Sequence, residues 1–309
     1  MSPQAWLDWL NWFISRVAAY YMADPIKFYF LPSAALLAIL AYEILTKEDW
    51  RSRYFSRNFC NDAIYYFFYF GGIYQFFVWS WMYKGGTHLF THYLPSFQLD
   101  LISHLPPTMQ IVALIFAFDF FSYWSHRIRH AVPWFWAFHS SHHSQKTLTA
   151  MTAFREHFLD ETIFRIILFI PFQILGYSPL LAAWLWWDLI TAWITGAQHS
   201  TLPWSYGPLG RVFVSPRFHR IHHTIDEELA NRNFSGVFSF WDDLFGTAER
   251  KAPTPTEHGL PGHPIPETLT GHLIYPFVVI ARDLRGRTKE TDSAAPVVGS
   301  QERTSTSRS

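Results

Sequence analysis

Residues 126–143 read HRIRHAVPWFWAFHSSHH, an HxxxH motif followed by an HxxHH motif, and a second HxxHH motif begins at residue 219. The histidines of these motifs are His126, His130, His139, His142, His143, His219, His222 and His223. Residues three or four apart lie on one face of a helix, so each motif can direct its imidazoles toward one point. Eight histidines exceed the roughly four to six ligands that one metal ion takes. The motifs therefore predict a site for two metal ions.

The composition is typical of a membrane protein with a substantial polar part. Hydrophobic residues make up 50% of the 309 residues and aromatic residues 19%, while charged residues reach only 16%, below the ~25% of soluble domains. The formal net charge is zero, so nothing indicates a nucleic-acid partner. The single cysteine, Cys60, excludes an internal disulfide. A mean hydropathy of +0.03 leaves room for a polar region outside the bilayer.

Residues 1–25 are predicted to form an amphipathic interfacial helix. Asp8, Asn11 and Arg16 interrupt the apolar run, which argues against a secretory signal. Apolar side chains recur at helical spacing, and tryptophan suits a membrane surface. These side chains are Trp6, Trp9, Leu10, Phe13 and Val17. An ordinary packed helix remains the alternative.

Apolar stretches at residues 26–45, 63–82 and 108–125 are long enough to cross a bilayer. The first two place N-terminal transmembrane helices in residues 26–107, and the third leads directly into His126. Basic residues are concentrated between the first two stretches, and Lys84 is the one basic residue of the next connection. The concentrated residues are Lys47, Arg51, Arg53 and Arg57. By the positive-inside rule the histidine motifs face the cytoplasm.

The remaining chain is predicted to complete a catalytic domain over residues 108–253. Apolar arms at 162–175 and 180–197, separated by a Gly-Tyr-Ser-Pro turn, indicate a hairpin in the membrane that ends at His199. Residues 254–284 form a C-terminal segment with a surface helix at 271–284, and 285–309 are expected to be disordered. The fold class is therefore an all-α integral membrane protein, a transmembrane helix bundle with a cytoplasmic, histidine-rich di-metal cap.

Two aspartates in the apolar stretches are candidates to orient metal-bound imidazoles. Asp119 lies seven and eleven residues before His126 and His130, and Asp188 lies eleven before His199, so each shares a helix face with those histidines. Carboxylates commonly accept the second N–H of a metal-bound imidazole. Polar packing between spans is the alternative, and either role places them in the protein interior. Asp242, beyond the last motif, is a third candidate.

Isolated histidines divide by their position in the topology. His199 ends the hairpin on the side of the motifs and is predicted to be a ninth ligand. His157 is either a tenth ligand or a polar residue near the membrane face. The others are not expected to bind metal, because three fall on the opposite side and three on the C-terminal surface. They are His88, His92 and His104, and His258, His263 and His272.

The motifs resemble those of the fatty acid hydroxylase/sterol desaturase superfamily, which are membrane non-haem di-iron oxygenases. The resemblance covers the three histidine motifs, Asn233-Phe234 and the stretch Trp241-Asp242-Asp243-Leu244-Phe245-Gly246-Thr247. Gln198-His199-Ser200, Gly207-Pro208-Leu209-Gly210 and Ser215-Pro216 are most similar to alkylglycerol monooxygenase-like members. Some members carry a further HxxxH before the last motif. Here Thr195 occupies its first position, which leaves His199 alone.

This resemblance implies two iron ions that activate O₂ and an oxygenase that hydroxylates a lipid C–H bond. Imidazole also suits zinc, and a lipid or sterol desaturase would use the same scaffold. A third alternative is a zinc-dependent membrane hydrolase, with Glu156 or Glu161 as general base, or a metal-binding protein. The aromatic stretch 133–138 either lines the substrate's access route or anchors the chain in the interface.

The sequence contains no dinucleotide-binding glycine pattern, no CxxC and no haem-attachment motif. Reducing electrons are therefore expected from a separate protein, a ferredoxin or cytochrome b5-like donor. The expected location is the bacterial inner membrane or the endoplasmic reticulum, with the active site facing the cytoplasm.

Overall fold

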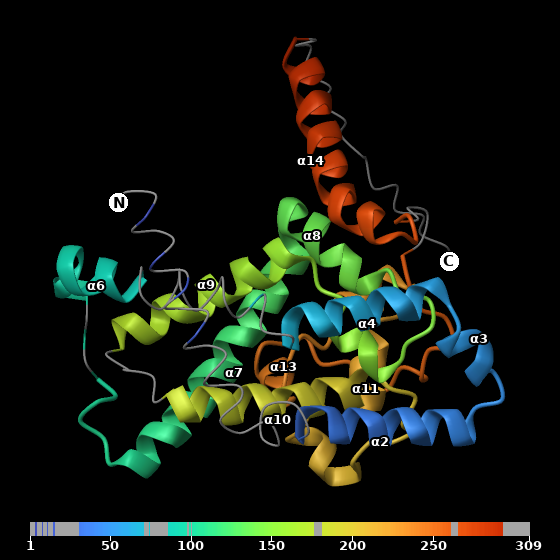
Figure 1. The fold of residues 1–309 in the computed structure, drawn as a ribbon, viewed down its shortest axis with the longest axis horizontal. Coiled ribbons are helices and arrows are strands. Elements are labelled where there is room, and N and C mark those ends of the chain that lie inside the picture. The colour runs from blue at the N-terminus through green and yellow to red at the C-terminus, as the bar shows by residue number, and fades with distance from the viewer. Residues whose placement is uncertain are drawn as a thin grey trace, which may run out of the picture.

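The computed structural model describes residues 31–70, 86–97, 101–175, 181–260 and 265–292, together with single positions at 4, 8, 11, 15, 74 and 99 (Figure 1). The described part is mostly helical and contains no β-strand, apart from isolated bridges. Its elements are α2 (Leu31–Thr46), α3 (Trp50–Tyr54), α4 (Arg57–Phe70), α6 (Thr87–Tyr93), η3 (Pro95–Phe97), α7 (Pro107–Ala131), α8 (Pro133–His143), η4 (Ala150–Phe154), α9 (Phe158–Ile174), α10 (Leu181–His199), η5 (Gly207–Arg211), α11 (Pro216–His222), α12 (Glu227–Ala230), α13 (Phe240–Leu244) and α14 (Leu269–Asp292).

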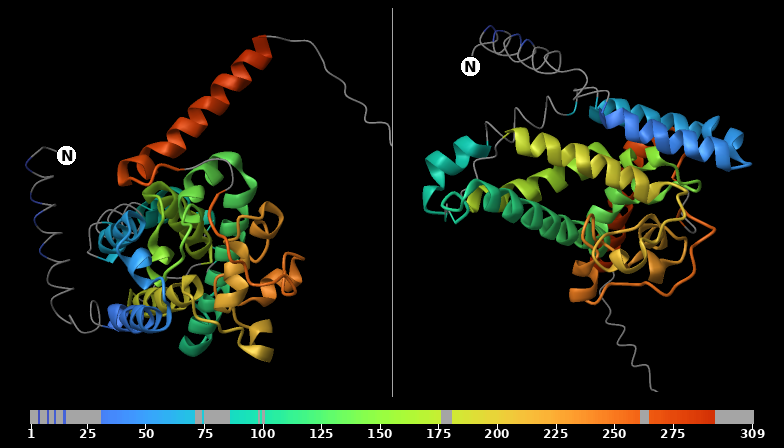
Figure 2. Two further views of the ribbon diagram at one scale, coloured as in Figure 1. Left: turned by 90° about the vertical axis from the view of Figure 1, so that its right-hand side faces the viewer. Right: turned by 90° about the horizontal axis from the view of Figure 1, so that it is seen from below.

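The long helices α2, α4, α7, α9 and α10 run in broadly similar directions, while α14 projects away from them (Figures 1 and 2). α10 packs against α2, η4 and α11, and α7 packs against α8 and α9. The short helices α8, α11 and α13 gather where α7 and α10 end. This arrangement brings the three histidine motifs to one end of the long helices.

Prolines set the junction between α7 and α8. Pro107 begins α7, where its missing N–H leaves no helical hydrogen bond unmade. Val132 is extended, with φ −100° and ψ 116°, because the ring of Pro133 disfavours a helical conformation in the preceding residue. Pro133 then begins α8, which packs against α7. The chain therefore turns sharply between the HxxxH motif and the first HxxHH motif and brings them together.

α7 is a candidate membrane span, since it has 25 residues and is apolar enough to cross a bilayer. Among the described residues, α7 alone meets both the length and the hydropathy criterion. α2 is also apolar but has only 16 residues. The predicted stretch at 63–82 and the interfacial helix at 1–25 lie largely outside the described residues. The two predicted hairpin arms correspond to α9 and α10, and the turn between them lies outside the described residues.

The C-terminal helix is longer than the sequence suggested. α14 begins at Leu269 and ends at Asp292, so residues 285–292 are helical where disorder was expected. Arg285, Arg287, Lys289 and Glu290 are good helix formers, and they continue a helix that α8 already supports. Helix propensity therefore outweighed the polar, small-residue composition that predicted a disordered tail.

Two clusters of buried apolar side chains hold the long helices at the histidine end. One joins α2, α4, η4 and α10 through Leu36, Tyr66, Phe154 and Ala192. The other joins α7, α9 and the loop at Val237 through Leu114, Phe118 and Leu168. Burial of such side chains contributes about 1.5–3 kcal/mol each, so these clusters fix the distances between the helices that carry histidines.

A fully buried ion pair ties α4 to the loop after η4. Arg155 and Asp62 are each 0% exposed, and Arg155 Nε donates to Asp62 Oδ1 at 2.5 Å. Gln145 Nε2 donates to Asp62 Oδ2 at 2.8 Å, and Arg155 Nη2 donates to the carbonyl of Asn58 at 2.8 Å. Because both charges are out of water, each depends on its partner.

We expect Arg155→Met to lower the free energy of unfolding by about 3–5 kcal/mol, because it leaves the Asp62 carboxylate buried without its cation. Asp49→Asn is the matched control: Asp49 pairs with Arg53 at 2.7 Å but its side chain is 52% exposed, so the loss should be below about 1 kcal/mol. Thermal unfolding of the detergent-solubilised protein measures both. Equal melting temperatures for wild type and Arg155→Met would contradict the expectation.

Candidate metal centre

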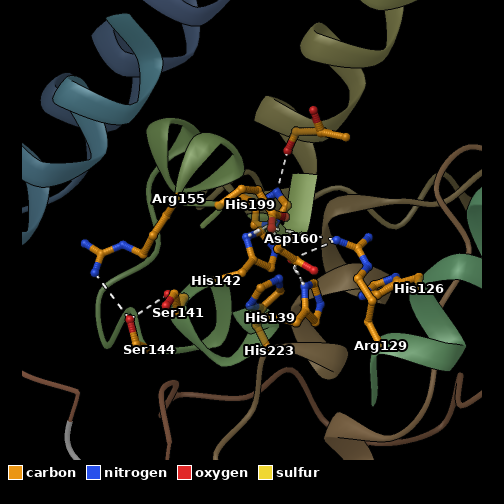
Figure 3. Close-up of polar contacts among 12 residues, drawn as sticks. His126, Arg129, His139, Ser141, His142, Ser144, Arg155, Asp160, His199 and His223 are labelled. Carbon is orange, nitrogen blue, oxygen red and sulfur yellow. Dashed lines mark hydrogen bonds and ion pairs between the residues drawn. The ribbon is translucent and has the colours of Figure 1, made fainter. Parts of the chain in front are cut away.

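Nine histidines converge in two adjacent groups. Figure 3 shows His126, His139, His142, His199 and His223 gathered at one place. The five-histidine group contains His126, His130, His139, His143 and His222. The four-histidine group contains His142, His199, His219 and His223. Within each group, one ring nitrogen from every residue lies within 4.8 Å of the others. The structure therefore brings together all eight histidines of the three motifs and also His199.

Local sequence explains how the last motif reaches the site. Ser215 caps α11, since its Oγ accepts a hydrogen bond from the backbone N–H of Phe218 at 3.2 Å, and Pro216 occupies the first turn. This cap fixes where the helix begins. His219 and His222 then lie one turn apart, and His223 follows at the helix end. α11 thereby contributes to both groups.

Within each group, Nε2 atoms lie close to one another. His222 Nε2 lies 3.0 Å from His126 Nε2 in the five-histidine group, while His142 Nε2 and His219 Nε2 lie 3.0 Å and 3.1 Å from His199 Nε2 in the four-histidine group. The Nε2 atoms of His130, His139 and His143 are buried and have no hydrogen-bond partner among the described residues. Nitrogen atoms that bind one metal ion at about 2.0–2.1 Å lie roughly 3 Å from one another. The spacing of these donor atoms therefore fits metal binding.

The opposite ring nitrogens hold the imidazoles in place. His126 Nδ1 donates to the carbonyl of Phe234 at 2.8 Å, His199 Nδ1 to that of Thr195 at 2.7 Å, and His222 Nδ1 to that of Arg232 at 2.8 Å. An imidazole that donates through Nδ1 keeps its lone pair on Nε2. These backbone carbonyls therefore present three Nε2 lone pairs to the site.

Burial keeps the imidazoles neutral, which is the form that binds metal. It lowers the pKa of His222 to about 3, despite the opposing hydrogen bond to Arg232. Burial and neighbouring imidazoles also lower the pKa values of His142, His143, His219 and His223 well below the usual 6.5. Protons therefore compete weakly for these lone pairs at neutral pH.

A cavity of about 260 Å³ lies against both groups. One wall carries histidines from each group, and the other walls carry aromatic and small side chains from α7, α9, α10 and the segment around η4. The histidines are His126, His139, His142, His199 and His219, and the aromatic residues are Tyr69, Tyr74, Phe118, Phe154, Phe164 and Phe234. Charged side chains also line it, namely Asp119, Arg129, Glu156, Glu161 and Arg165. The cavity thus combines aromatic walls with charged groups beside the donor nitrogens.

Comparison with known sequences identifies the segment that carries this site. A sequence model of the fatty acid hydroxylase family matches residues 111–247, which contain all nine converging histidines. Residues 111–247 are thus similar to fatty acid hydroxylase domains. No solved structure matches the chain.

Several proteins similar to this chain are named for the oxidation of lipids. The chain is 34% identical over 174 residues to the ornithine lipid hydroxylase OlsE of Rhizobium tropici, covering 56% of this chain and 51% of that protein. It is 33% identical over 132 residues to human alkylglycerol monooxygenase, covering 42% and 28%. A putative methylsterol monooxygenase of Dictyostelium discoideum is 29% identical over 188 residues, covering 53% and 64%. The chain thus matches about half or less of the length of the first two relatives.

Asp160 and Arg129 belong to the site, although the sequence did not single them out. Asp160 Oδ2 accepts hydrogen bonds from His139 Nδ1 at 2.9 Å and from Arg129 Nη1 at 3.0 Å (Figure 3). Asp160 thereby orients His139, as a carboxylate partner of a metal-binding imidazole does. The available signal was an acidic pair, Asp160 and Glu161, at the start of an apolar helix, where buried charge usually has a role.

The predicted supporting aspartates act on backbone instead of on histidines. Asp119 is buried as expected, but it accepts from the N–H groups of Val237 and Phe238, each at 2.8 Å, and from Trp241 Nε1 at 3.0 Å. Asp242 accepts from the N–H of Phe234 at 2.8 Å, and so holds the residue whose carbonyl receives His126. The side chain of Asp188, in α10, lies outside the described residues.

His157 lies outside both histidine groups. It caps α9, where its Nδ1 accepts from the N–H of Leu159 at 3.2 Å, and its Nε2 lies 3.2 Å from the carbonyl of Leu273. Both ring nitrogens are thus engaged with backbone. We therefore leave His157 out of the proposed ligands and keep the other nine.

The isolated histidines expected on the C-terminal surface are more buried than predicted. His272 is 1% exposed, stacks on Tyr65 at 6.2 Å and lies 3.4 Å from Arg155 Nη1, while His258 is partly buried. His272 is buried because it packs against Arg155 and Tyr65, which are distant in sequence. His263 lies outside the described residues, and His88 and His92 lie on α6, far from α11 (Figure 1).

We expect wild-type protein to hold two metal ions per chain and His199→Ala to hold about one, because the four-histidine group would keep three nitrogens. His157→Asn should hold two, since asparagine also caps helices well and His157 is not a proposed ligand. Elemental mass spectrometry of protein purified in detergent measures the content. Two ions in His199→Ala, or one in His157→Asn, would contradict the assignment.

Proposed function

We propose that this protein is a membrane-bound di-iron oxygenase that hydroxylates a C–H bond of a lipid with O₂ and externally supplied electrons. The observation that carries the proposal is that histidines of both groups line the cavity, together with aromatic side chains. This arrangement would hold an apolar substrate beside a metal centre. The relatives act, by name, on ornithine lipid, alkylglycerol and methylsterol, which supports a lipid substrate for this chain.

The five-histidine and four-histidine groups would each hold one ion. Neutral imidazole suits iron and zinc alike, but zinc has no redox chemistry. Relatives named hydroxylase and monooxygenase insert oxygen, and this favours iron. Bound iron would supply the activation of O₂. No feature of the described site favours the hydrolase or desaturase alternatives.

The chain's own residues would position the substrate and exclude water. Phe118 and Phe164 line the cavity and are also in contact with each other, their rings 6.5 Å apart, where they would hold a hydrocarbon chain. Gln198 also lines the cavity, but its Nε2 donates to the carbonyl of Gly236 at 2.7 Å. Ser122 Oγ is buried, lines the cavity and has no hydrogen-bond partner among the residues that the structure describes. Ser122 is therefore the group we assign to a polar atom of the substrate.

Hydroxylation consumes one O₂, two electrons and two protons for each C–H bond, giving an alcohol and one water. We infer that a separate protein supplies the electrons, a ferredoxin or a cytochrome b5-like donor, because the sequence has no motif for a flavin, nicotinamide or haem cofactor. The distribution of basic residues supports a cytoplasmic metal centre, which such a donor can reach.

Membrane contact is supported by the lipid-facing character of α7. Met109, Ile111, Val112 and Phe116 are exposed large apolar side chains along this candidate span. The histidines His126 and His130 lie at the other end of the same helix. A lipid in the bilayer would therefore reach the cavity without passing through water.

We expect cells that express the protein to accumulate a lipid one oxygen atom heavier than its precursor, with that oxygen derived from O₂. Growth under ¹⁸O₂ and lipid mass spectrometry measure this, with His222→Ala as the control that keeps the fold and removes one proposed ligand. Loss of two hydrogens without added oxygen would contradict hydroxylation and indicate a desaturase. Identical lipids with and without the protein would contradict an oxygenase acting on host lipids.

A further inference from the structure

α14 has an apolar face that the rest of the chain does not cover. Ile274, Phe277, Val278 and Leu284 are 58%, 48%, 39% and 45% exposed. Phe277 and Val278 lie three and four residues after Ile274, and Leu284 lies seven after Phe277, so all four share one side of the helix. An exposed apolar stripe of this length on a monomer usually marks an interaction surface.

The opposite face of α14 packs on the protein. His272 and Pro276 are buried, and Trp134 Nε1, from α8, donates to Asp283 Oδ2 at 3.1 Å. Tyr275 and Val279 line a second cavity, beside His130 and His143. The helix is therefore fixed to α8 by one face, which determines where its apolar face points.

α14 runs across the direction of the candidate span. In Figures 1 and 2 it leaves the body next to α8, at a steep angle to α7, α9 and α10. α8 follows directly on the histidine-bearing end of α7. A helix that crosses the direction of a span at its end lies close to the plane of the membrane surface.

The apolar face of α14 is continuous with the surface of α9. The ring of Phe277 lies 5.5 Å from that of Phe138 and 6.0 Å from that of His157, which stacks on Phe158 at 4.8 Å. Phe158 is 39% exposed, and it begins α9, along which Ile166 and Ile170 are exposed. A bilayer in contact with α9 would therefore extend to α14.

Charge on α14 complements an anionic membrane surface. Residues 282–289 contain the basic residues Arg282, Arg285, Arg287 and Lys289, and one acidic residue, Asp283, which already bonds Trp134. Basic residues beside an apolar stripe are typical of helices that bind anionic lipid. A soluble protein partner would not require this combination of stripe, orientation and charge.

We propose that α14 is an interfacial helix that rests on the bilayer at the membrane face of the metal centre. Its apolar face, Ile274, Phe277, Val278 and Leu284, lies at the boundary of headgroups and acyl chains, and Arg282 and Arg285 contact anionic headgroups. Trp134, which is 43% exposed and bonded to α14, lies at the same boundary. This contact holds α8, which carries the proposed ligands His139, His142 and His143, against the membrane.

Spin-label accessibility in the full-length protein tests this proposal. On a Cys60→Ser background, labels are attached at Val278→Cys on the apolar face and at Glu228→Cys, an exposed polar position on α12, in nanodiscs of phosphatidylcholine and phosphatidylglycerol. We expect an O₂-to-nickel-chelate accessibility ratio several-fold higher at 278 than at 228. Bound metal, which reports an intact site, should be the same in both labelled proteins.

Equal, high nickel access at 278 and 228 would overturn the proposal, because the apolar face of α14 would then be exposed to water. Exclusion of both reagents at 278 would also overturn it and indicate a protein covering the face. In nanodiscs of phosphatidylcholine alone, the ratio at 278 should fall. An unchanged ratio would remove the basic residues from the proposal. None of these outcomes depends on enzyme turnover, so they are independent of the proposed oxygenase activity.

Discussion

The structure depends on the burial of nine neutral imidazoles whose lone pairs converge on two points. A buried polar atom without a partner costs about 1–3 kcal/mol, and the Nε2 atoms of His130, His139 and His143 lack hydrogen-bond partners in the part of the chain that the structure describes. A metal ion would satisfy these atoms together. The metal-free fold would therefore be strained at its centre, and metal binding would contribute to folding stability.

The surrounding polar groups reduce the cost of bringing three distant segments together. Asp119 and Asp242 bind backbone N–H groups of the loop between α11 and α13, and this loop supplies the carbonyl that receives His126. Glu43, which is 0% exposed, accepts from the N–H of Thr201 at 2.6 Å, just beyond His199. Asp119, Asp242 and Glu43 thus stabilise backbone turns beside the site. These turns then position the imidazoles.

Sequence spacing predicted which histidines of a motif converge, because helical periodicity decides which of them share a face. HxxxH and HxxHH are such local patterns, and His199 followed from its place at the end of an apolar arm. Asp160 could not be found this way, because its contact with His139 depends on how α9 packs beside α7 and α8. His157 looked like a ligand by proximity in sequence. Its place at a helix start gives its ring nitrogens backbone partners instead.

The helical class also followed from local patterns, whereas the details that depend on distant contacts did not. The sequence did not predict the burial of His272, because it arises from packing on Tyr65 and Arg155, which are distant in sequence. Membrane orientation rests on the distribution of Lys and Arg along the sequence.

If the protein is a di-iron enzyme, each histidine group holds one iron ion. Anomalous difference maps from crystals of the full-length protein, collected on either side of the iron absorption edge, test this arrangement. We expect two iron peaks, one among His126, His130, His139, His143 and His222 and the other among His142, His199, His219 and His223. A single peak, or peaks that persist below the iron edge as another metal would give, would contradict it.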